Sequence, residues 1–327
     1  MGADANIQVR AGLIGTGHYG IALLCQARAI PGLELRAVCD LRIERAHKAF
    51  VYAGLVEGEV VFVDGPSAAQ RAYDYGFWFA TEDAAALMNL PLDVIVECTG
   101  DAEAGARHAL AAIEHGKHVA MMNKETDCAV GPLLRQRAEA AGVVYTAVDG
   151  DQHGLLIKLV RWARALGLDV VCGGKARDAE FVCGPEEGVV SDGETEVTLD
   201  DELREVLAPI GGEECAAKAQ RRREALSALE HVANFDLAEL TIAANATGLA
   251  PEMPRLNAFA LRTPEIPRVL CPEDGGGALD NRGAIEAVTC LRGPHEAGLG
   301  GGVFIVVACH NARSEEHTSE LQSPSAI

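Results

Sequence analysis

A glycine-spaced loop near the start of the chain constrains the fold more than any other feature. The sequence GTGHYG at residues 15–20 stands between an apolar, strand-like run (7–14) and a helical pattern. Gly15 permits a tight turn, Gly17 lets an anion come close to the backbone, and Gly20 lets the helix pack against the strand. Strand, loop and helix in this order predict the first unit of a parallel sheet, with a phosphate group bound at the helix N-terminus.

An acidic residue, Asp40, follows the second strand-like run (33–39). A carboxylate at the end of this strand can accept both ribose hydroxyls of a dinucleotide. Asp40 favours NAD because it repels a 2′-phosphate, whereas Arg42 and Arg45 could pair with that phosphate and leave NADP open. The alternative for the two arginines is that they are ordinary solvated residues at the start of a helix. We predict a bound NAD(P) here, in contact with Gly15, Thr16, Gly17, His18, Tyr19, Gly20, Asp40 and Arg42.

Strand-like and helix-like segments continue to alternate up to residue 150. Apolar runs end at Cys98-Thr99-Gly100, at Asn123-Lys124 and at Asp149. This alternation predicts an α/β fold, a Rossmann-type doubly wound parallel sheet over residues 1–150 that binds its ligand at the carboxyl ends of the strands. The less regular residues 55–92 are expected to form a helical insertion that packs an aromatic cluster on the core: Tyr73, Tyr75, Phe77, Trp78 and Phe79.

A second, α+β domain for catalysis and dimerisation is predicted over residues 151–312. Residues 155–166 have strong helical spacing, 169–173 are strand-like, and a polar stretch then extends to residue 201. The arginine-rich residues 217–223 are interpreted as a solvated helix face. Further helices are expected at 213–229 and 235–246, and further strands at 283–291 and 302–309.

Candidate catalytic residues follow three of the predicted strands. Lys124 could bind a substrate oxygen and shuttle its proton, with a surface lysine as the alternative. Lys175 is either a cationic anchor or part of a surface turn. The turn that begins at Asp149 and Asp151 could orient a hydroxyl, transfer a proton or bind a divalent cation, although helix capping alone explains one of its acids. We assign Lys124, Asp149, Asp151 and Lys175 as catalytic and no residue as a metal ligand.

The composition narrows the classes of partner. A formal net charge of -20 disfavours nucleic acid and membrane surfaces as partners and favours a small-molecule substrate. The ten cysteines are scattered and form no C-x-x-C pair, which indicates reduced thiols. The chain shows no signal peptide and no apolar run of membrane-spanning length, so we expect a cytoplasmic protein. A homo-oligomer is also expected.

The five motifs GLIGTGHYG, DVIVECTG, HVAMMNKETD, VDGDQHG and ANATGL, in this order, make the chain similar to the homoserine-dehydrogenase-like NAD(P)-dependent oxidoreductases. It most resembles their branch related to the deoxyxylulose-phosphate-reductoisomerase-like (DRL-like) enzymes. The resemblance implies hydride transfer at a CH-OH or carbonyl carbon of a small polar substrate, which could be phosphorylated or carboxylated. It also implies that Cys98, Thr99 and Gly100 lie at the nicotinamide half and that Asn123 and Lys124 face the reacting centre.

The sequence departs from the DRL-like pattern in two places. A lysine-bearing segment that some relatives carry before ANATGL is replaced by ANFDL at 233–237, which puts the reductoisomerase activity in doubt. A C-terminal SAF-type segment is expected to be missing, and residues 313–327 contain an in-frame translation of a sequencing adapter, which we interpret as not native. The alternatives are homoserine dehydrogenase proper, a non-catalytic nucleotide-binding protein, and an inactive truncated fragment.

Overall fold

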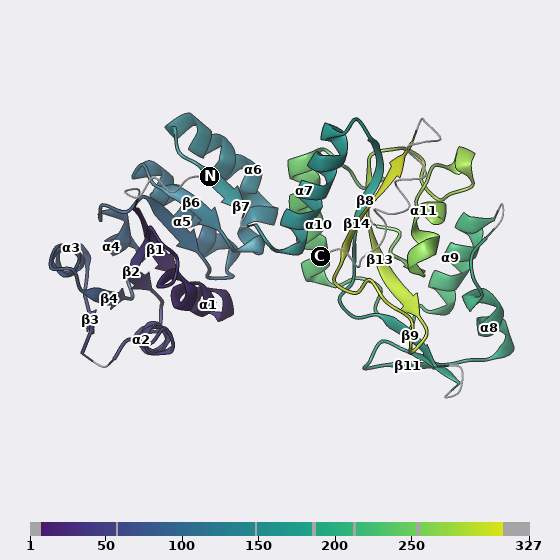
Figure 1. Ribbon diagram of the computed structural model, residues 1–327, viewed down its shortest axis with the longest axis horizontal. Helices are drawn as coiled ribbons and strands as arrows, with labels where there is room; N and C mark the ends of the chain where they lie inside the picture. The colour runs from purple at the N-terminus through teal and green to yellow at the C-terminus, as the bar shows by residue number, and fades with distance from the viewer. Residues whose placement is uncertain are drawn as a thin grey trace. The chain divides into compact units, whose positions relative to one another are not determined.

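The computed structural model describes residues 8–309 except 57, 148, 185–187, 212–213 and 253–255. It divides into two compact units, Met1–Val148 and Asp149–Ile327, and each unit is described by itself (Figure 1). The segment 313–327, interpreted above as an adapter translation, lies outside the described residues. Within the described part of the chain, no helix is both long enough and apolar enough to cross a membrane.

Unit 1 is a doubly wound sheet, which confirms the predicted Rossmann-type fold. All the strand pairs described in it are parallel, in the order β3-β4-β2-β1-β5-β6-β7. Its elements are β1 (Val9–Ile14), α1 (His18–Ala27), β2 (Leu33–Cys39), α2 (Ile43–Tyr52), β3 (Val60–Phe62), α3 (Pro66–Asp74), β4 (Trp78–Thr81), α4 (Ala84–Met88), β5 (Val94–Glu97), α5 (Ala102–Glu114), β6 (His118–Met121), α6 (Lys124–Ala141) and β7 (Tyr145–Ala147).

Two apolar layers cover the two faces of this sheet. On one face, Leu24 of α1 and Phe50 of α2 pack against strand residues such as Leu13 and Val38. On the other face, α3, α4, α5 and α6 supply small and aliphatic side chains. Because both faces are buried, the strands are almost continuously apolar. The polar residues of the site therefore lie at the carboxyl ends of the strands.

The prediction for residues 55–92 was wrong in part, because this segment adds two strands to the sheet and not a helical insertion alone. Trp78 and Phe79, expected on a helix, lie in β4, which pairs with β2 and β3. Phe79 is fully buried in the sheet core. These strands have three and four residues, too few for a periodic pattern to appear in the sequence.

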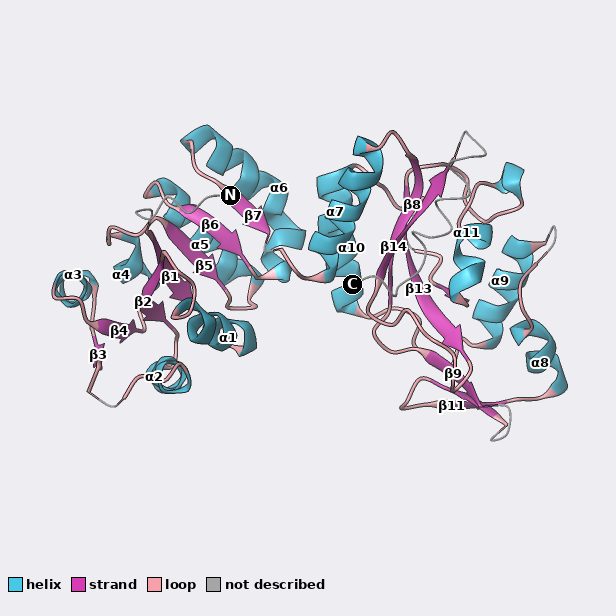
Figure 2. Cartoon of the chain, viewed as in Figure 1, coloured by secondary structure: helices cyan, strands magenta, loops and turns pink. Residues whose placement is uncertain are grey.

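Unit 2 has a mixed sheet with helices on both faces (Figure 2). Its strands run in the order β11-β10-β9-β13-β8-β14, and β12 pairs with β13. Helices α7 and α10 cover one face, while α8, α9 and α11 lie on the other. Its elements are α7 (Gln152–Ala165), β8 (Asp169–Ala176), β9 (Phe181–Gly184), β10 (Val189–Ser191), β11 (Glu196–Thr198), α8 (Asp201–Leu207), α9 (Cys215–Ala225), α10 (Asn234–Thr247), β12 (Phe259–Leu261), η1 (Thr263–Glu265), α11 (Ile266–Val269), η2 (Glu273–Gly275), β13 (Ala284–Arg292) and β14 (Val303–Ala308).

The polar stretch up to residue 201, in which no helix or strand was predicted, forms three short strands, β9, β10 and β11. The interpretation of residues 217–223 as a solvated helix face needs correction. The arginine run is not wholly solvated, because Arg222 is completely buried and its guanidinium lies 2.6 Å from Glu265. A buried ion pair links helix α9 to the segment before α11, and the sequence does not reveal this long-range partner.

Candidate functional site

The glycine loop between β1 and α1 has the geometry that phosphate binding requires. Gly15 has a φ of +96°, and a Cβ there would lie 2.7 Å from the backbone of Cys98. A Cβ at Gly20 would lie 2.2 Å from the carbonyl oxygen of Gly15. A Cβ at Gly17 would meet nothing within 4 Å, so space is open beside the backbone at the start of α1. The loop therefore fits a dinucleotide pyrophosphate.

Asp40 is joined to this loop by hydrogen bonds. Its Oδ2 atom accepts from the Thr16 amide at 2.9 Å and from the Thr16 hydroxyl at 2.6 Å. Its Oδ1 atom accepts from the Arg42 amide at 3.0 Å. Burial raises the pKa of Asp40, but these hydrogen bonds outweigh burial and the net shift is downward. Asp40 is therefore an ionised acceptor beside the loop, while the Arg42 side chain is exposed.

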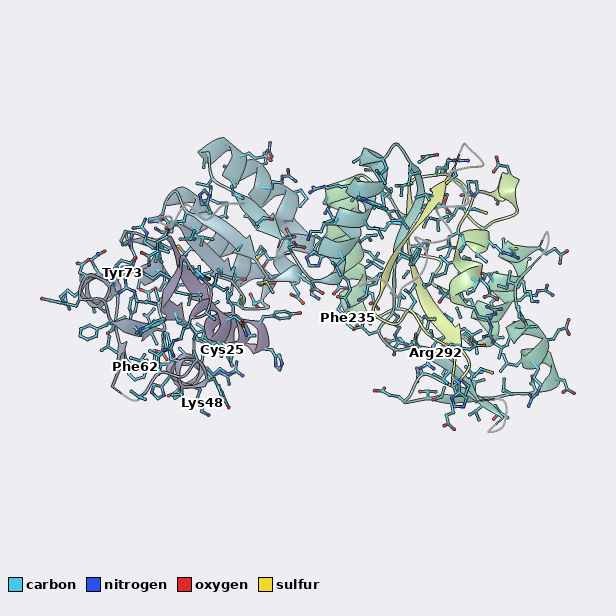
Figure 3. All side chains as sticks on the ribbon, in the orientation of Figure 1. Cys25, Lys48, Phe62, Tyr73, Phe235 and Arg292 are labelled. Atoms are coloured by element: carbon cyan, nitrogen blue, oxygen red, sulfur yellow. The ribbon has the colours of Figure 1, made fainter. Side chains whose placement is uncertain are left out.

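A hollow of about 380 Å³ lies at the ends of β3 and β4 and the start of α2. Ile43, Phe62 and Val63 give it apolar walls, and Phe62 is labelled in Figure 3. Its polar lining includes Glu82 and Asp83, and Glu82 accepts a hydrogen bond from the amide of Ile43 at 3.3 Å. The hollow lies on the Asp40 side of β1 in the sheet order. Glu82 and Asp83 give it a negative electrostatic potential.

On the other side of β1, polar residues follow β5 and β6. The Asn123 amide donates to the Thr99 hydroxyl at 3.2 Å and to the carbonyl of Asp101 at 2.8 Å. Asn123 is also the N-cap of α6, because its Oδ1 atom accepts from the Thr126 amide at 3.1 Å. Lys124 is the first residue of α6 and is half-buried. This cap begins helix α6 at Lys124.

Lys175 lies in a buried strand, so the predicted alternative of a surface turn is wrong. Strand β8 continues to Ala176 and not only to residue 173, because it pairs with β13 and β14. The Lys175 Nζ atom is 2.7 Å from Asp236 and 2.5 Å from Glu239, and all three side chains are at most 2% exposed. Asp178 lies 3.7 Å away. We refer to Lys175, Asp236 and Glu239 as the buried triad.

The contacts of Lys175 favour its charged form. Burial lowers the pKa of Lys175, but hydrogen bonds and attraction from Asp236 and Glu239 outweigh it, and the net shift is upward. The Nζ atom also lies 4.8 Å from the ring centroid of Phe235, the residue labelled in Figure 3 near the start of α10. Lys175 is therefore an ammonium ion, held between two carboxylates and an aromatic ring.

The two acids that begin unit 2 differ in their surroundings. Asp149 is 60% exposed, and its carboxylate lies 2.5 Å from the Nζ atom of Lys158, which lowers the pKa of Asp149. Asp151 is the N-cap of α7, and its Oδ1 atom accepts from the Gln152 amide at 2.8 Å. Asp149 is thus paired at an exposed site, whereas Asp151 caps a helix. No group of three or more His, Cys, Asp or Glu side chains among the described residues is arranged to hold a metal ion.

Two sets of polar residues were missed in the sequence. Asp236 and Glu239 are three residues apart, which puts both on one face of α10, and this spacing was the available signal. Glu97 ends the apolar strand β5 with a side chain that is 0% exposed, and an acid at the end of such a run was its signal. The predicted residues therefore fall into two groups: Lys124 with the nucleotide loop in unit 1, and Asp149, Asp151 and Lys175 in unit 2.

The doubly wound sheet and its glycine loop define unit 1 as a dinucleotide-binding domain. Residues 11–147 match the family model of the homoserine dehydrogenase NAD binding domain. Residues 150–326, more than half of the chain, match the family model of the oxidoreductase DRL catalytic domain. The chain belongs to the DRL oxidoreductase family, which confirms the resemblance drawn from its motifs.

Solved structures of other proteins match part of this chain. A probable dehydrogenase from Thermotoga maritima is 17% identical, with a TM-score of 0.38 over 53% of this chain and 46% of that one. The myo-inositol dehydrogenase from Lactobacillus casei, solved with NAD(H) and myo-inositol, is 16% identical, with a TM-score of 0.39 over 54% and 48%. This chain spans about half the length of these solved structures. No curated protein matches it.

Proposed function

We propose that this protein is an NAD(P)-dependent oxidoreductase that acts on a CH-OH or carbonyl carbon of a small polar substrate. The observation that carries the proposal is the loop of Gly15, Gly17 and Gly20, with Asp40 hydrogen-bonded to Thr16 within it. Membership of an oxidoreductase family supports the chemistry. The bound nicotinamide would accept or supply the hydride. The chain's own residues would bind the dinucleotide, orient the substrate and move the proton.

Lys124 is proposed to move that proton, because it stands at the end of β6 on the side of β1 away from Asp40. Replacing Lys124 by methionine is expected to lower kcat by about 100- to 10,000-fold, the range for loss of a general acid or base. The Kd for NADH should stay unchanged. The measurement is steady-state turnover on a substrate found by screening polyols, sugar phosphates and amino-acid alcohols. Normal turnover of Lys124→Met would contradict the assignment.

In unit 2, we propose that Asp151 orients the substrate hydroxyl and that Lys175 is a positioning residue. The burial of Lys175 keeps it from direct contact with a solvent-borne substrate, whereas its ion pairs fix Asp236 and Glu239. Its ammonium charge also offsets part of the negative charge of the two acids. The role of Asp149 is proposed to be minor, because Lys158 already pairs with it at an exposed site.

We further propose that the protein prefers NAD to NADP. Asp40 stays ionised at the loop, and Glu82 adds a second negative charge at the neighbouring hollow. A 2′-phosphate there would meet repulsion that the exposed Arg42 offsets only in part. Asp40→Ser is expected to raise the Kd for NADH about tenfold and to lower the Kd for NADPH about tenfold.

The preference is measured by calorimetric titration of each nucleotide into each variant. Glu44→Gln is the matched control, because it removes one exposed charge from the first turn of α2 and leaves Asp40 in place. Its nucleotide preference should equal that of the wild type. A wild-type protein that binds NADPH more tightly than NADH would show that the arginines dominate.

Homoserine dehydrogenase proper is the second candidate, favoured by the match of residues 11–147 to that enzyme's NAD binding domain. A direct assay with homoserine and each nucleotide distinguishes it. Turnover of homoserine at a rate well above that of other amino-acid alcohols would make it the function. Tight nucleotide binding with no turnover of any screened substrate would instead favour a non-catalytic binding protein.

A further inference from the structure

A buried carboxylate, Glu97, lies directly beneath the loop that joins β5 to α5. Its Oε1 atom accepts from the Thr99 hydroxyl at 2.6 Å and from the Thr99 amide at 3.4 Å. The same oxygen lies 3.1 Å from the Nδ1 atom of His108 on α5. The Glu97 side chain is 0% exposed, and His108 is 21% exposed. Glu97 thus ties the loop to helix α5 from inside the domain.

Glu97 also sets the direction of a hydrogen-bond chain that reaches α6. The Thr99 hydroxyl has a single hydrogen and gives it to the Glu97 carboxylate, so its lone pairs face Asn123. Asn123 then donates to Thr99, at 3.2 Å, and to the carbonyl of Asp101. This orientation leaves the Asn123 carbonyl oxygen to cap α6 through the amide of Thr126. One acceptor therefore orders both the β5–α5 loop and the start of the helix that carries Lys124.

Helices α5 and α6 pack closely around Glu97. The Oε2 atom has no hydrogen-bond partner among the described residues and faces Gly105 of α5. A Cβ at Gly105 would lie 2.1 Å from the Thr126 hydroxyl, 2.7 Å from the Asn123 amide nitrogen and 3.1 Å from this Oε2 atom. A glycine at this place lets α5 and α6 close around the polar chain. Glu97, Thr99, His108, Asn123 and Thr126 therefore form one hydrogen-bonded node.

We propose that Glu97, with His108 as its partner, is a positioning residue for the nicotinamide half of the dinucleotide. This inference rests on the proposed function. The sheet order places β5 and β6 on one side of β1, and β2 with Asp40 on the other. A dinucleotide bound across β1 has one half on each side. Glu97 therefore governs the nicotinamide half, while the glycine loop and Asp40 hold the adenosine half.

Effects on the two halves of the dinucleotide are distinguished by titrating two ligands, ADP-ribose and NADH, into the full chain. Glu97→Leu removes the acceptor and is expected to raise the Kd for NADH about tenfold. Its Kd for ADP-ribose should match the wild type, because that ligand lacks the nicotinamide. Glu97→Gln keeps an Oε1 acceptor, so it should restore NADH binding to near the wild-type value. Glu103→Gln, an exposed change on helix α5, is the control and should alter neither Kd.

His108→Leu tests the same node at a partly exposed position and keeps the inference testable even if Glu97→Leu does not fold. It removes one of the donors to Glu97 and is expected to raise the Kd for NADH about threefold, with ADP-ribose unaffected. A folded Glu97→Leu or His108→Leu protein that binds NADH like the wild type would overturn the inference. So would an equal loss for both ligands, which indicates a merely structural role. If the wild type fails to bind ADP-ribose, the proposed function itself is wrong.

Discussion

The Gly17→Ala protein is expected to melt like the wild type and yet to bind NADH at least about a hundredfold more weakly. A Cβ at this position meets no protein atom within 4 Å, so the folded chain can accommodate it. The same Cβ enters the space in which a pyrophosphate approaches the backbone. Nucleotide affinity and stability should therefore separate at this residue.

Two other glycines provide the comparison. Gly20→Ala places a Cβ 2.2 Å from the Gly15 carbonyl oxygen, so it should lose both affinity and stability. Gly211→Ala in unit 2, where the nearest atom to the added Cβ is an arginine side-chain nitrogen 3.7 Å away, should change neither. Calorimetric titration and thermal melting measure the two properties. If Gly17→Ala bound NADH with wild-type affinity, no phosphate would lie against this loop.

Lys175→Met is expected to destabilise unit 2 by about 3–5 kcal/mol, because it leaves two buried carboxylates without their cation. Adding Asp236→Asn and Glu239→Gln to the same protein should recover much of this loss, since no buried charge then remains unpaired. Arg282→Met is the control. It breaks a half-exposed pair with Asp169 and should cost at most about 1 kcal/mol. The free energy of unfolding from urea titration is the measurement.

The difference in stability between the wild type and Lys175→Met depends on pH with a definite sign. The folded-state pKa of Lys175 is raised above its ordinary value of 10.5. The stabilisation from the ammonium form is therefore fully present below about 10.5 and is lost as the pH rises through the raised folded-state pKa. The stability gap between wild type and Lys175→Met should stay constant through neutral pH and narrow only in strong base. A Lys175→Met protein as stable as the wild type would show that the buried triad contributes nothing to the free energy of unfolding.

Much of unit 1 could be predicted from its sequence because its signals are local. The strand at 33–39 was predicted with the bounds of β2, since an apolar run there ends in a polar residue. The glycines of the loop at 15–20 have the spacing of a turn whose backbone lies close to an anion. The strands β3 and β4 were missed because each is very short, and their partners in the sheet decide their conformation.

The candidate site of unit 2 could be predicted only in part, because its contacts are long-range. Lys175 was named as a candidate because it follows a predicted strand, but its burial depends on strands more than 100 residues later in the chain. Its partners Asp236 and Glu239 come from helix α10, 61 and 64 residues away. Glu97 was missed for the same reason, since its role is defined by contacts with α5 and α6. Local patterns located the loop, and tertiary packing determined the network behind it.

A calorimetric titration of NADH and NADPH into the full chain tests most directly whether unit 1 is a dinucleotide site. We predict saturable binding of one NADH per chain, with NADPH binding about tenfold more weakly. We also expect Gly17→Ala to abolish most of that heat without lowering the melting temperature. If neither nucleotide produced a binding heat with a folded wild-type protein, the assignment of unit 1 as a working dinucleotide site would be contradicted.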